Sequence, residues 1–208
     1  MSAFTLTSTD VFKISDESGT VYYGGDQRWF PAKDFKKDAA CGATTCANIL
    51  NYFARTKADA ARLCPFDSHT KNGFLDFMKD IYPFVKPGII GIMPGDFTKG
   101  GENYAASRGF TLTHDLLTVP AAKGHRPTAE TAARFISAAL SDDLPVAFLN
   151  LSNGRVKNLD SYHWVTIVAL DTASMMSRIV DNGRLLDVDI AKWLKRSTMG
   201  GAFVVAEL

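Results

Sequence analysis

Cys41 stands in the sequence context that best suits a nucleophilic thiol. A thiol attacks a carbonyl carbon as the thiolate, and free cysteine, with a pKa of about 8.5, is mostly protonated at neutral pH. The partial positive charge at a helix N-terminus and a neighbouring imidazole both favour the thiolate. Cys41 directly precedes an apolar pattern of helical spacing, and Gly42 would leave backbone N–H groups open to a substrate carbonyl. The alternative is a small cysteine buried at a helix end.

The other two cysteines are expected to have no chemical role. Cys46 lies near the apolar stripe of the same helix, which predicts a core position, and Cys64 precedes a proline in a loop or partial core. The pair of Cys41 and Cys46 lacks a matching second pair, so we expect no structural zinc site. Three cysteines and no visible signal peptide favour a reducing compartment, and we predict a cytoplasmic location.

His163 is the predicted base. It opens the apolar run His163–Leu170, whose alternation predicts a strand that holds the imidazole at its rim. The alternative is a strand-end histidine that bonds to a backbone carbonyl. The remaining histidines stand in polar or loop segments and are expected to be solvated: His69, His114 and His125.

Two further groups would complete such a site. An acceptor behind the imidazole fixes its tautomer, and Asp181 follows a strand that we expect to pair antiparallel with the His163 strand. Asn182 is the alternative, although its position before Gly183 is already explained by a hairpin turn. Gln27, on a loop beside aromatic residues, is a suitable amide donor to an oxyanion, or else a surface glutamine in a turn.

The hydrophobic pattern predicts an α+β fold. Helices are predicted from Cys41 to about Ala54, over Asn72–Tyr82, over Glu102–Arg108 with Gly109 as cap, from a Thr128 cap to Leu140 and over Asp189–Lys195. Strands are predicted over Phe110–Leu116, Val146–Leu151, His163–Leu170, Ser177–Asp181 and Ala202–Glu207, and residues 88–101 are expected to be irregular. The prediction is one domain, residues 1–208, with a helical half (about 39–140) packed on an antiparallel β half (about 144–208).

The composition excludes several classes of protein. The 23 Lys and Arg residues nearly balance 22 Asp and Glu residues, giving a net charge of +1, so we expect no nucleic-acid partner. No apolar run approaches the roughly 18–20 residues that cross a bilayer, so we expect no membrane span. A hydrophobic fraction of 46% is ordinary for a globular chain and argues against disorder.

Three blocks together resemble the papain-like cysteine peptidases, and more closely their bacterial C39-like branch. The first is Asp26–Trp29 followed by Ala40–Thr45, which is similar to the family's glutamine loop and Cys-Gly helix start. The second is Leu144–Val146 followed by Tyr162–Val168, similar to the strand pair that presents the family's histidine. The third is Ile179–Asp181, similar to the block with the acidic member.

The order Gln, Cys, His, Asp agrees with the family, and the chain departs from it in two places. Many members have proline after the acidic residue, where this chain has Asn182. Residues 55–123 match no block of the family and are expected to shape substrate preference.

The resemblance implies a papain-like fold and a thiol hydrolase that cleaves a peptide or amide bond without a metal or organic cofactor. Cys41 would be the nucleophile and His163 its proton partner. Asp181 would orient the imidazole, Gln27 would donate to the oxyanion, and the partner would be a peptide or protein substrate. Two alternatives stay open: an acyltransferase or transglutaminase-like enzyme on the same triad, and a non-catalytic binding module on a papain-like scaffold.

Overall fold

The structure is a computed structural model that describes residues 2–31, 33–89 and 91–208. The chain forms two compact units and passes between them several times. The sheet unit comprises Met1–Thr7, His114–Val180 and Leu185–Glu207, and the helical unit comprises Ser8–Thr113, Asp181–Arg184 and Leu208.

The described strands around the sheet unit form a seven-stranded sheet. They are β1 (Ala3–Thr5), β4 (Thr113–Val119), β5 (Val146–Asn150), β6 (His163–Asp171), β7 (Met176–Asp181), β8 (Arg184–Asp189) and β9 (Gly201–Glu207). Their order is β4-β9-β5-β6-β7-β8, with β1 paired to the C-terminal part of β6. The pairs β1–β6, β5–β6, β5–β9 and β6–β7 are antiparallel, as the sequence predicts for the C-terminal half.

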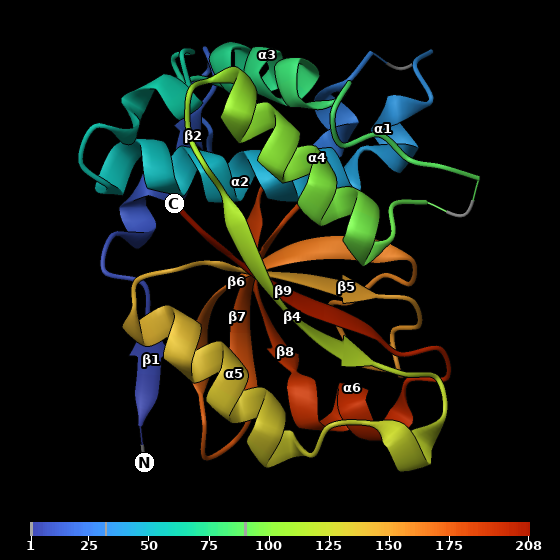
Figure 1. Cartoon of the computed structure of the whole chain (residues 1–208). Helices are drawn as coiled ribbons and strands as arrows, with labels where there is room; N and C mark the ends of the chain where they lie inside the picture. The colour runs from blue at the N-terminus through green and yellow to red at the C-terminus, as the bar shows by residue number, and fades with distance from the viewer. Residues whose placement is uncertain (1, 32, 90) are drawn as a thin grey trace. The chain divides into compact units, whose positions relative to one another are not determined.

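Helix α5 (Ala129–Ser141) covers one face of this sheet (Figure 1). The Thr128 side chain accepts a hydrogen bond from the backbone N–H of Thr131, which confirms the predicted N-cap. The stripe of Ala132, Ile136 and Leu140 is buried, and the helix contacts β1, β5 and β6. The predicted division near residue 140 therefore differs from the structure, because α5 and β4 belong to the sheet unit.

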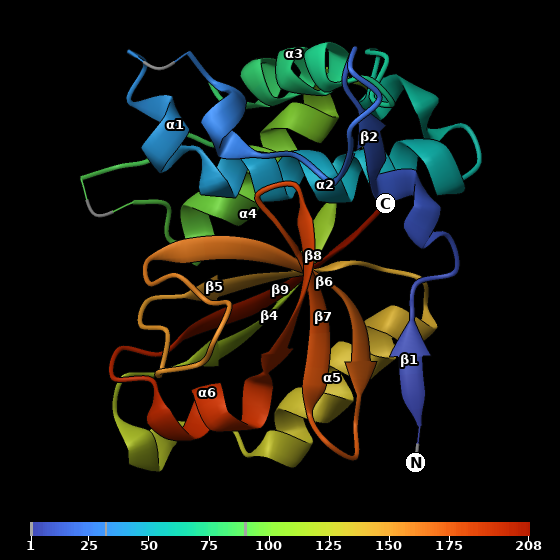
Figure 2. The same cartoon turned by 180° about the vertical axis from the view of Figure 1, so that it is seen from behind.

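The helical unit is built around α2 (Cys41–Thr56). The other helices of this unit are α1 (Lys36–Ala39), α3 (Lys71–Ile81), α4 (Pro94–Ser107) and the short 3-10 helices η1 (Thr9–Phe12), η2 (Gln27–Trp29) and η3 (Ala60–Leu63). Strands β2 (Lys13–Ser15) and β3 (Val21–Tyr23) form an antiparallel ribbon beside them. α2 contacts η1, η3, α3 and α4. Figure 2 shows α3 and α4 beside α2.

Burial of α2 is more complete than its single predicted stripe. All residues from Gly42 to Phe53 are buried, including polar ones, which is typical of a helix that is enclosed on every side. The buried Asn48 accepts a hydrogen bond from the N–H of Gly25 at 2.9 Å, and the buried Asn51 accepts one from the hydroxyl of Ser68 at 2.5 Å. These bonds satisfy polar groups that the core would otherwise leave unpaired.

The expectation of an irregular segment over residues 88–101 is wrong for its second half, because α4 begins at Pro94. A proline in the first turn suits a helix start, since its missing N–H has no intrahelical acceptor there. The intrinsic cost of glycine in a helix is overridden by packing: a Cβ on Gly100 would lie 2.5 Å from the carbonyl oxygen of Phe84. The predicted cap at Gly109 is confirmed by its φ of +84°.

Most other element predictions are confirmed with shifted ends. α3 buries the predicted face, and α6 (Ile190–Arg196) begins after Asp189, whose side chain caps it. β4 begins and ends three residues later than the predicted strand. The structure is therefore α+β with a mostly antiparallel sheet.

Candidate active site

Cys41 is the first residue of α2, as the sequence predicts. The backbone N–H and the hydroxyl of Thr44 both donate to the carbonyl oxygen of Ala40, at 2.8 and 2.9 Å, and so close the first turn of the helix. The Cys41 residue is half-buried. A partly accessible thiol thus stands where the helix dipole favours negative charge.

The other two thiols are poor nucleophiles. Cys46 is 4% exposed, and burial raises the pKa of its thiol from 9.0 to about 12. Burial also raises the pKa of Cys64, although a backbone hydrogen bond with Phe66 opposes the shift. Both groups are therefore protonated at neutral pH, and the prediction that Cys46 is a core residue is confirmed.

Gly42 has a packing role that the sequence did not indicate. A Cβ at this position would lie 2.6 Å from Cδ1 of Ile92, a buried side chain in the segment that leads into α4. The glycine therefore lets Ile92 pack directly against the first turn of α2. This contact explains Gly42 without the open approach to backbone N–H groups that the sequence suggested.

Gln27 begins η2, and the side chain of Asp26 fixes that turn. One carboxylate oxygen of Asp26 accepts from the backbone N–H of Arg28 at 2.9 Å. Nε and Nη2 of Arg28 also donate to the Asp26 carboxylate, at 2.8 and 2.6 Å. Gln27 itself is 9% exposed, and its Oε1 has no hydrogen-bond partner among the described residues. It is thus a buried amide on a fixed turn, not a surface glutamine.

The predicted hairpin turn lies between β7 and β8. Asn182 and Gly183 have φ of +45° and +73°, the pair of positive values that a tight type I′ turn requires. The N–H of Tyr23 donates to the carbonyl oxygen of Gly183 at 2.8 Å, and the N–H of Gly183 donates to that of Gly25 at 3.1 Å. The tip of the β7–β8 hairpin is therefore hydrogen-bonded to Tyr23 and Gly25, in the segment that leads to Gln27.

Arg28 adds a side-chain link between the same two segments. Its Nη2 donates to the carbonyl oxygen of Asn182 at 3.1 Å while it also bonds to Asp26. Asp181, directly before this turn, is 5% exposed. The segments of Gln27 and Asp181 are thus brought together within the helical unit.

Helix α1 connects Cys41 to the segment that contains Gln27. This short helix leads into α2 and contacts η2, the turn that begins with Gln27. Next to η2, the ring of Tyr82 lies 6.1 Å from the ring of Phe30 and 6.5 Å from that of Phe35. Three of the four predicted site residues, Cys41, Gln27 and Asp181, therefore belong to the helical unit.

His163, the fourth, is the first residue of β6 in the sheet unit. It is buried, and it follows Tyr162, whose φ of +56° is rare for a residue with a bulky side chain. Its cross-strand partner on β5 is Asn150, a buried residue that the sequence analysis did not single out. No local signal marks Asn150, since its position depends on the register between β5 and β6.

The remaining histidines lie elsewhere. His69 is exposed, and its Nε2 is 2.6 Å from Nη1 of Arg55. His125 is exposed in a short 3-10 turn, as predicted, whereas His114 lies in β4 and is half-buried, not fully solvated as expected.

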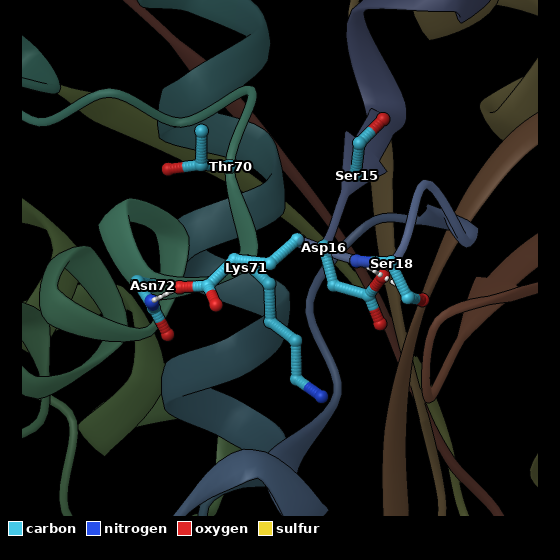
Figure 3. A pocket seen from close by; sticks show the side chains of 7 residues that line it. Ser15, Asp16, Ser18, Thr70, Lys71 and Asn72 are labelled. Carbon is cyan, nitrogen blue, oxygen red and sulfur yellow. Dashed lines mark hydrogen bonds between the residues drawn. The ribbon is translucent and has the colours of Figure 1, made fainter.

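A cavity of about 570 Å³ lies beside the β2–β3 ribbon of the helical unit (Figure 3). Its lining residues are Ser15, Asp16, Glu17, Ser18, Thr70, Lys71 and Asn72. These polar groups largely bond to one another: the N–H and hydroxyl of Ser18 donate to Asp16, and Asn72 donates to Glu17.

Within residues 2–31, 33–89 and 91–208, no group of three or more His, Cys, Asp or Glu side chains is arranged to hold a metal ion. Over the same residues, no helix has the length and apolar character needed to cross a membrane.

Comparison with known proteins adds no relative. A scan against protein-family models finds no match to this chain, and a search of the curated proteins finds no similar sequence.

Proposed function

We propose that this chain is a thiol hydrolase of the papain-like kind that cleaves a peptide or amide bond. The observation that carries the proposal is the place of Cys41, a half-buried thiol at the first residue of a sixteen-residue helix. The hydrogen-bonded segments of Gln27 and Asp181 in the same unit support it further.

In the proposed reaction, the Cys41 thiolate attacks the carbonyl carbon of the substrate while His163 holds the proton. The backbone N–H of Cys41 and the side-chain amide of Gln27 stabilise the oxyanion that develops. The C–N bond then breaks as His163 gives its proton to the leaving amine, which leaves a thioester on Cys41. Water, deprotonated by His163, attacks the thioester and releases the acid and the free thiol.

The strand register supports Asp181 over Asn182 as the group that orients His163. Val180 is the antiparallel partner of Thr166, and cross-strand partners share a face of the sheet. Because successive residues alternate, the residue after Val180 is expected on the face of Val165 and His163. Asn182 instead supplies the left-handed backbone and the carbonyl oxygen of the turn.

The first test is cleavage of a mixture of unrelated unfolded proteins, with new N-termini identified by mass spectrometry. We expect Cys41→Ala to abolish cleavage, and Cys64→Ala, the matched removal of a half-buried thiol outside the site, to retain it. Gln27→Ala is expected to lower the rate about 100-fold, the usual cost of one oxyanion donor. Cleavage that survives in Cys41→Ala would contradict the proposal.

The second test asks whether the Cys41 sulfur and the His163 imidazole are close enough to react with the same small molecule. A short dihaloketone alkylates a thiolate first and can then alkylate a nearby imidazole. We expect a covalent link between Cys41 and His163 within one chain, and His163→Ala should leave only the singly alkylated thiol. Single alkylation in the unchanged protein would count against His163 as the partner.

The acceptor that resolves the thioester distinguishes hydrolysis from acyl transfer. Adding an excess of a simple primary amine should leave free carboxylates as the main product of a hydrolase. A predominantly amidated product would instead assign the same residues to the acyltransferase or transglutaminase-like class. Chemistry at Cys41 needs a reduced thiol, which agrees with the cytoplasmic location predicted from the cysteine count.

A further inference from the structure

One end of the sheet unit carries a concentration of positive charge. Three segments meet there: residues 120–126, residues 152–158 and residues 190–199, which contain α6. They hold seven of the 23 Lys and Arg residues of the chain and none of its 22 Asp and Glu residues. Besides Arg126, these cations are Lys123, Arg155, Lys157, Lys192, Lys195 and Arg196, and we call these six the cationic surface.

Backbone and side-chain contacts hold the three segments together. Nη1 of Arg126 donates to the carbonyl oxygen of Leu194 at 2.8 Å, which joins the first segment to α6. A Cβ on Gly154 would lie 3.4 Å from the carbonyl carbon of Arg196, so the 152–158 loop passes close to the end of α6. Both views of the chain show the turn before α5 beside α6 (Figures 1 and 2). The charges are therefore neighbours in space although the segments are far apart in the sequence.

The protein itself does not neutralise the cationic surface. Five of its six residues are exposed, and Lys192 is half-buried. Among the residues that the structure describes, none of the six forms an ion pair with a carboxylate. Of the nearby carboxylates, Asp189 caps α6, Asp187 pairs with Arg178 on β7, and Asp160 follows the 152–158 loop. Like charges gathered in this way repel one another, and an anionic partner relieves that repulsion.

The remainder of the chain is acidic. Outside the three segments, 16 Lys and Arg residues stand against 22 Asp and Glu residues. A bilayer or a long nucleic-acid duplex is much larger than the cationic surface and would also meet part of this acidic remainder, which opposes binding. A short acidic stretch of polypeptide is small enough to contact the cations alone. Charge complementarity therefore favours a polypeptide segment rich in Asp and Glu.

The cationic surface borders the start of β6. The hydroxyl of Tyr162 donates to Sδ of Met199 at 3.0 Å, and Met199 lies in the same segment as Arg196. Tyr162 is 60% exposed and directly precedes His163. A polypeptide bound to the cationic surface would therefore lie near the residue that is proposed as the proton partner.

We propose that the cationic surface docks an acidic segment of a polypeptide, and that the substrates of this chain carry Asp or Glu close to the bond that is cleaved. The carboxylates of that segment bind the exposed Lys and Arg side chains. Arg contributes most, because a guanidinium donates two parallel hydrogen bonds to one carboxylate. The role in substrate choice rests on the proposed function, whereas the docking does not.

Docking is tested with a fluorescent peptide of alternating Glu and Gly residues, and with a Gln–Gly peptide of the same length as the neutral probe. Each is added to the full chain carrying Cys41→Ala, so that neither probe is cleaved, and binding is followed by fluorescence anisotropy. We expect only the acidic peptide to bind, and to bind more weakly as NaCl rises from about 50 to 300 mM, because salt screens exposed charges. Arg196→Glu and Lys157→Glu should each raise Kd about three- to tenfold, since a repulsion replaces an attraction.

The matched control is Arg134→Glu, which makes the same change in net charge at an exposed arginine of α5 in the same unit. This variant should leave Kd unchanged. Equal weakening by Arg134→Glu, or no binding of the acidic peptide, would overturn the inference. Tighter binding to vesicles of acidic phospholipid or to duplex DNA, if it is lost in Arg196→Glu, would also overturn it, because the surface would then serve a different partner.

The role in substrate choice is tested by the bonds that are cut in the mixture of unfolded proteins. We expect Asp and Glu to be enriched on one side of those bonds, and the enrichment to be lost in Arg196→Glu and kept in Arg134→Glu. Cleavage without this enrichment would overturn the role in substrate choice and leave the hydrolase intact. An acidic peptide that binds to a chain that cleaves no substrate would instead sustain the docking surface and defeat the proposed hydrolase.

Discussion

The contact between Gly42 and Ile92 makes a quantitative prediction about the first turn of α2. Gly42→Ala places a methyl group 2.6 Å from Cδ1 of Ile92, well inside van der Waals contact. Overpacking of this kind costs about 1–3 kcal/mol, against a gain of up to about 1 kcal/mol from the helix propensity of alanine. We therefore expect Gly42→Ala to destabilise the protein by about 1–2 kcal/mol.

Ile92→Val removes the one atom that clashes. The next contacts of the added Cβ are with Cβ and Cγ1 of Ile92, at 3.4 and 3.5 Å, which are ordinary distances. Ile92→Val alone should cost about 0.5–1.5 kcal/mol, as expected for a lost buried methyl group. In the double variant the new methyl group fills the space of Cδ1, so the two changes should couple favourably by about 1–2 kcal/mol.

The assay is urea unfolding of the four proteins of this double-mutant cycle, followed by tryptophan fluorescence. If Gly42→Ala costs as much free energy of unfolding in the Ile92→Val background as in the unchanged protein, the packing account of Gly42 is refuted. Cleavage by the same proteins separates packing from access. A double variant that is stable and active assigns Gly42 to packing, whereas one that is stable and inactive restores the role of the glycine in substrate approach.

Three other perturbations probe the helical unit. Burial raises the Cys46 pKa from its ordinary 9.0 to about 12. The folded protein therefore gains stability from the protonated thiol below pH 9 and loses that stability as the pH rises toward 12. In urea unfolding, Cys46→Val should remove a decrease of about 1.4 kcal/mol per pH unit in the free energy of unfolding over this range. The hydroxyl of Ser18 helps hold the Asp16 pKa at about 2, below 3.8, so Asp16→Asn should remove an acid-dependent loss of thermal stability as pH falls from 4 toward 2. Asp26→Asn weakens the link to Arg28 and should slow amide cleavage, while alkylation of Cys41 by iodoacetamide continues at an unchanged rate.

The sequence predicts features that depend on neighbouring residues. It does not predict features that depend on contacts between segments far apart in the chain. The start of α2, the cap at Thr128 and the turn at Asn182-Gly183 depend on a few neighbouring residues, and all three are confirmed. The sequence does not predict the start of α4, because its glycines argue against a helix. The packing that requires glycine at position 100, against the carbonyl oxygen of Phe84, is visible only in the structure.

The same distinction separates the site residues. Cys41 and Gln27 stand in local motifs. Cys41 begins the predicted helix, and Gln27, which is predicted on a loop, begins the short 3-10 helix η2. Asn150 has no motif, since an asparagine at a strand end is ordinary until the register sets it opposite His163. The roles of Cys41, His163, Asp181 and Gln27 stay predictions that the cleavage and cross-linking experiments address.

At the tip of the β7–β8 hairpin, we expect Asn182 to have a structural role and its neighbour Asp181 a chemical one. Asn182 has a left-handed backbone, and its carbonyl oxygen accepts from Arg28, so the backbone of this residue serves the turn. Asn182→Gly should preserve both features, because glycine adopts positive φ without strain and keeps the carbonyl group. If the turn is the only role of Asn182, this variant should fold and cleave substrate like the unchanged protein. Asp181→Ala leaves the turn intact and should lower kcat. If Asn182→Gly lowers kcat and Asp181→Ala does not, Asn182 is the residue that orients His163.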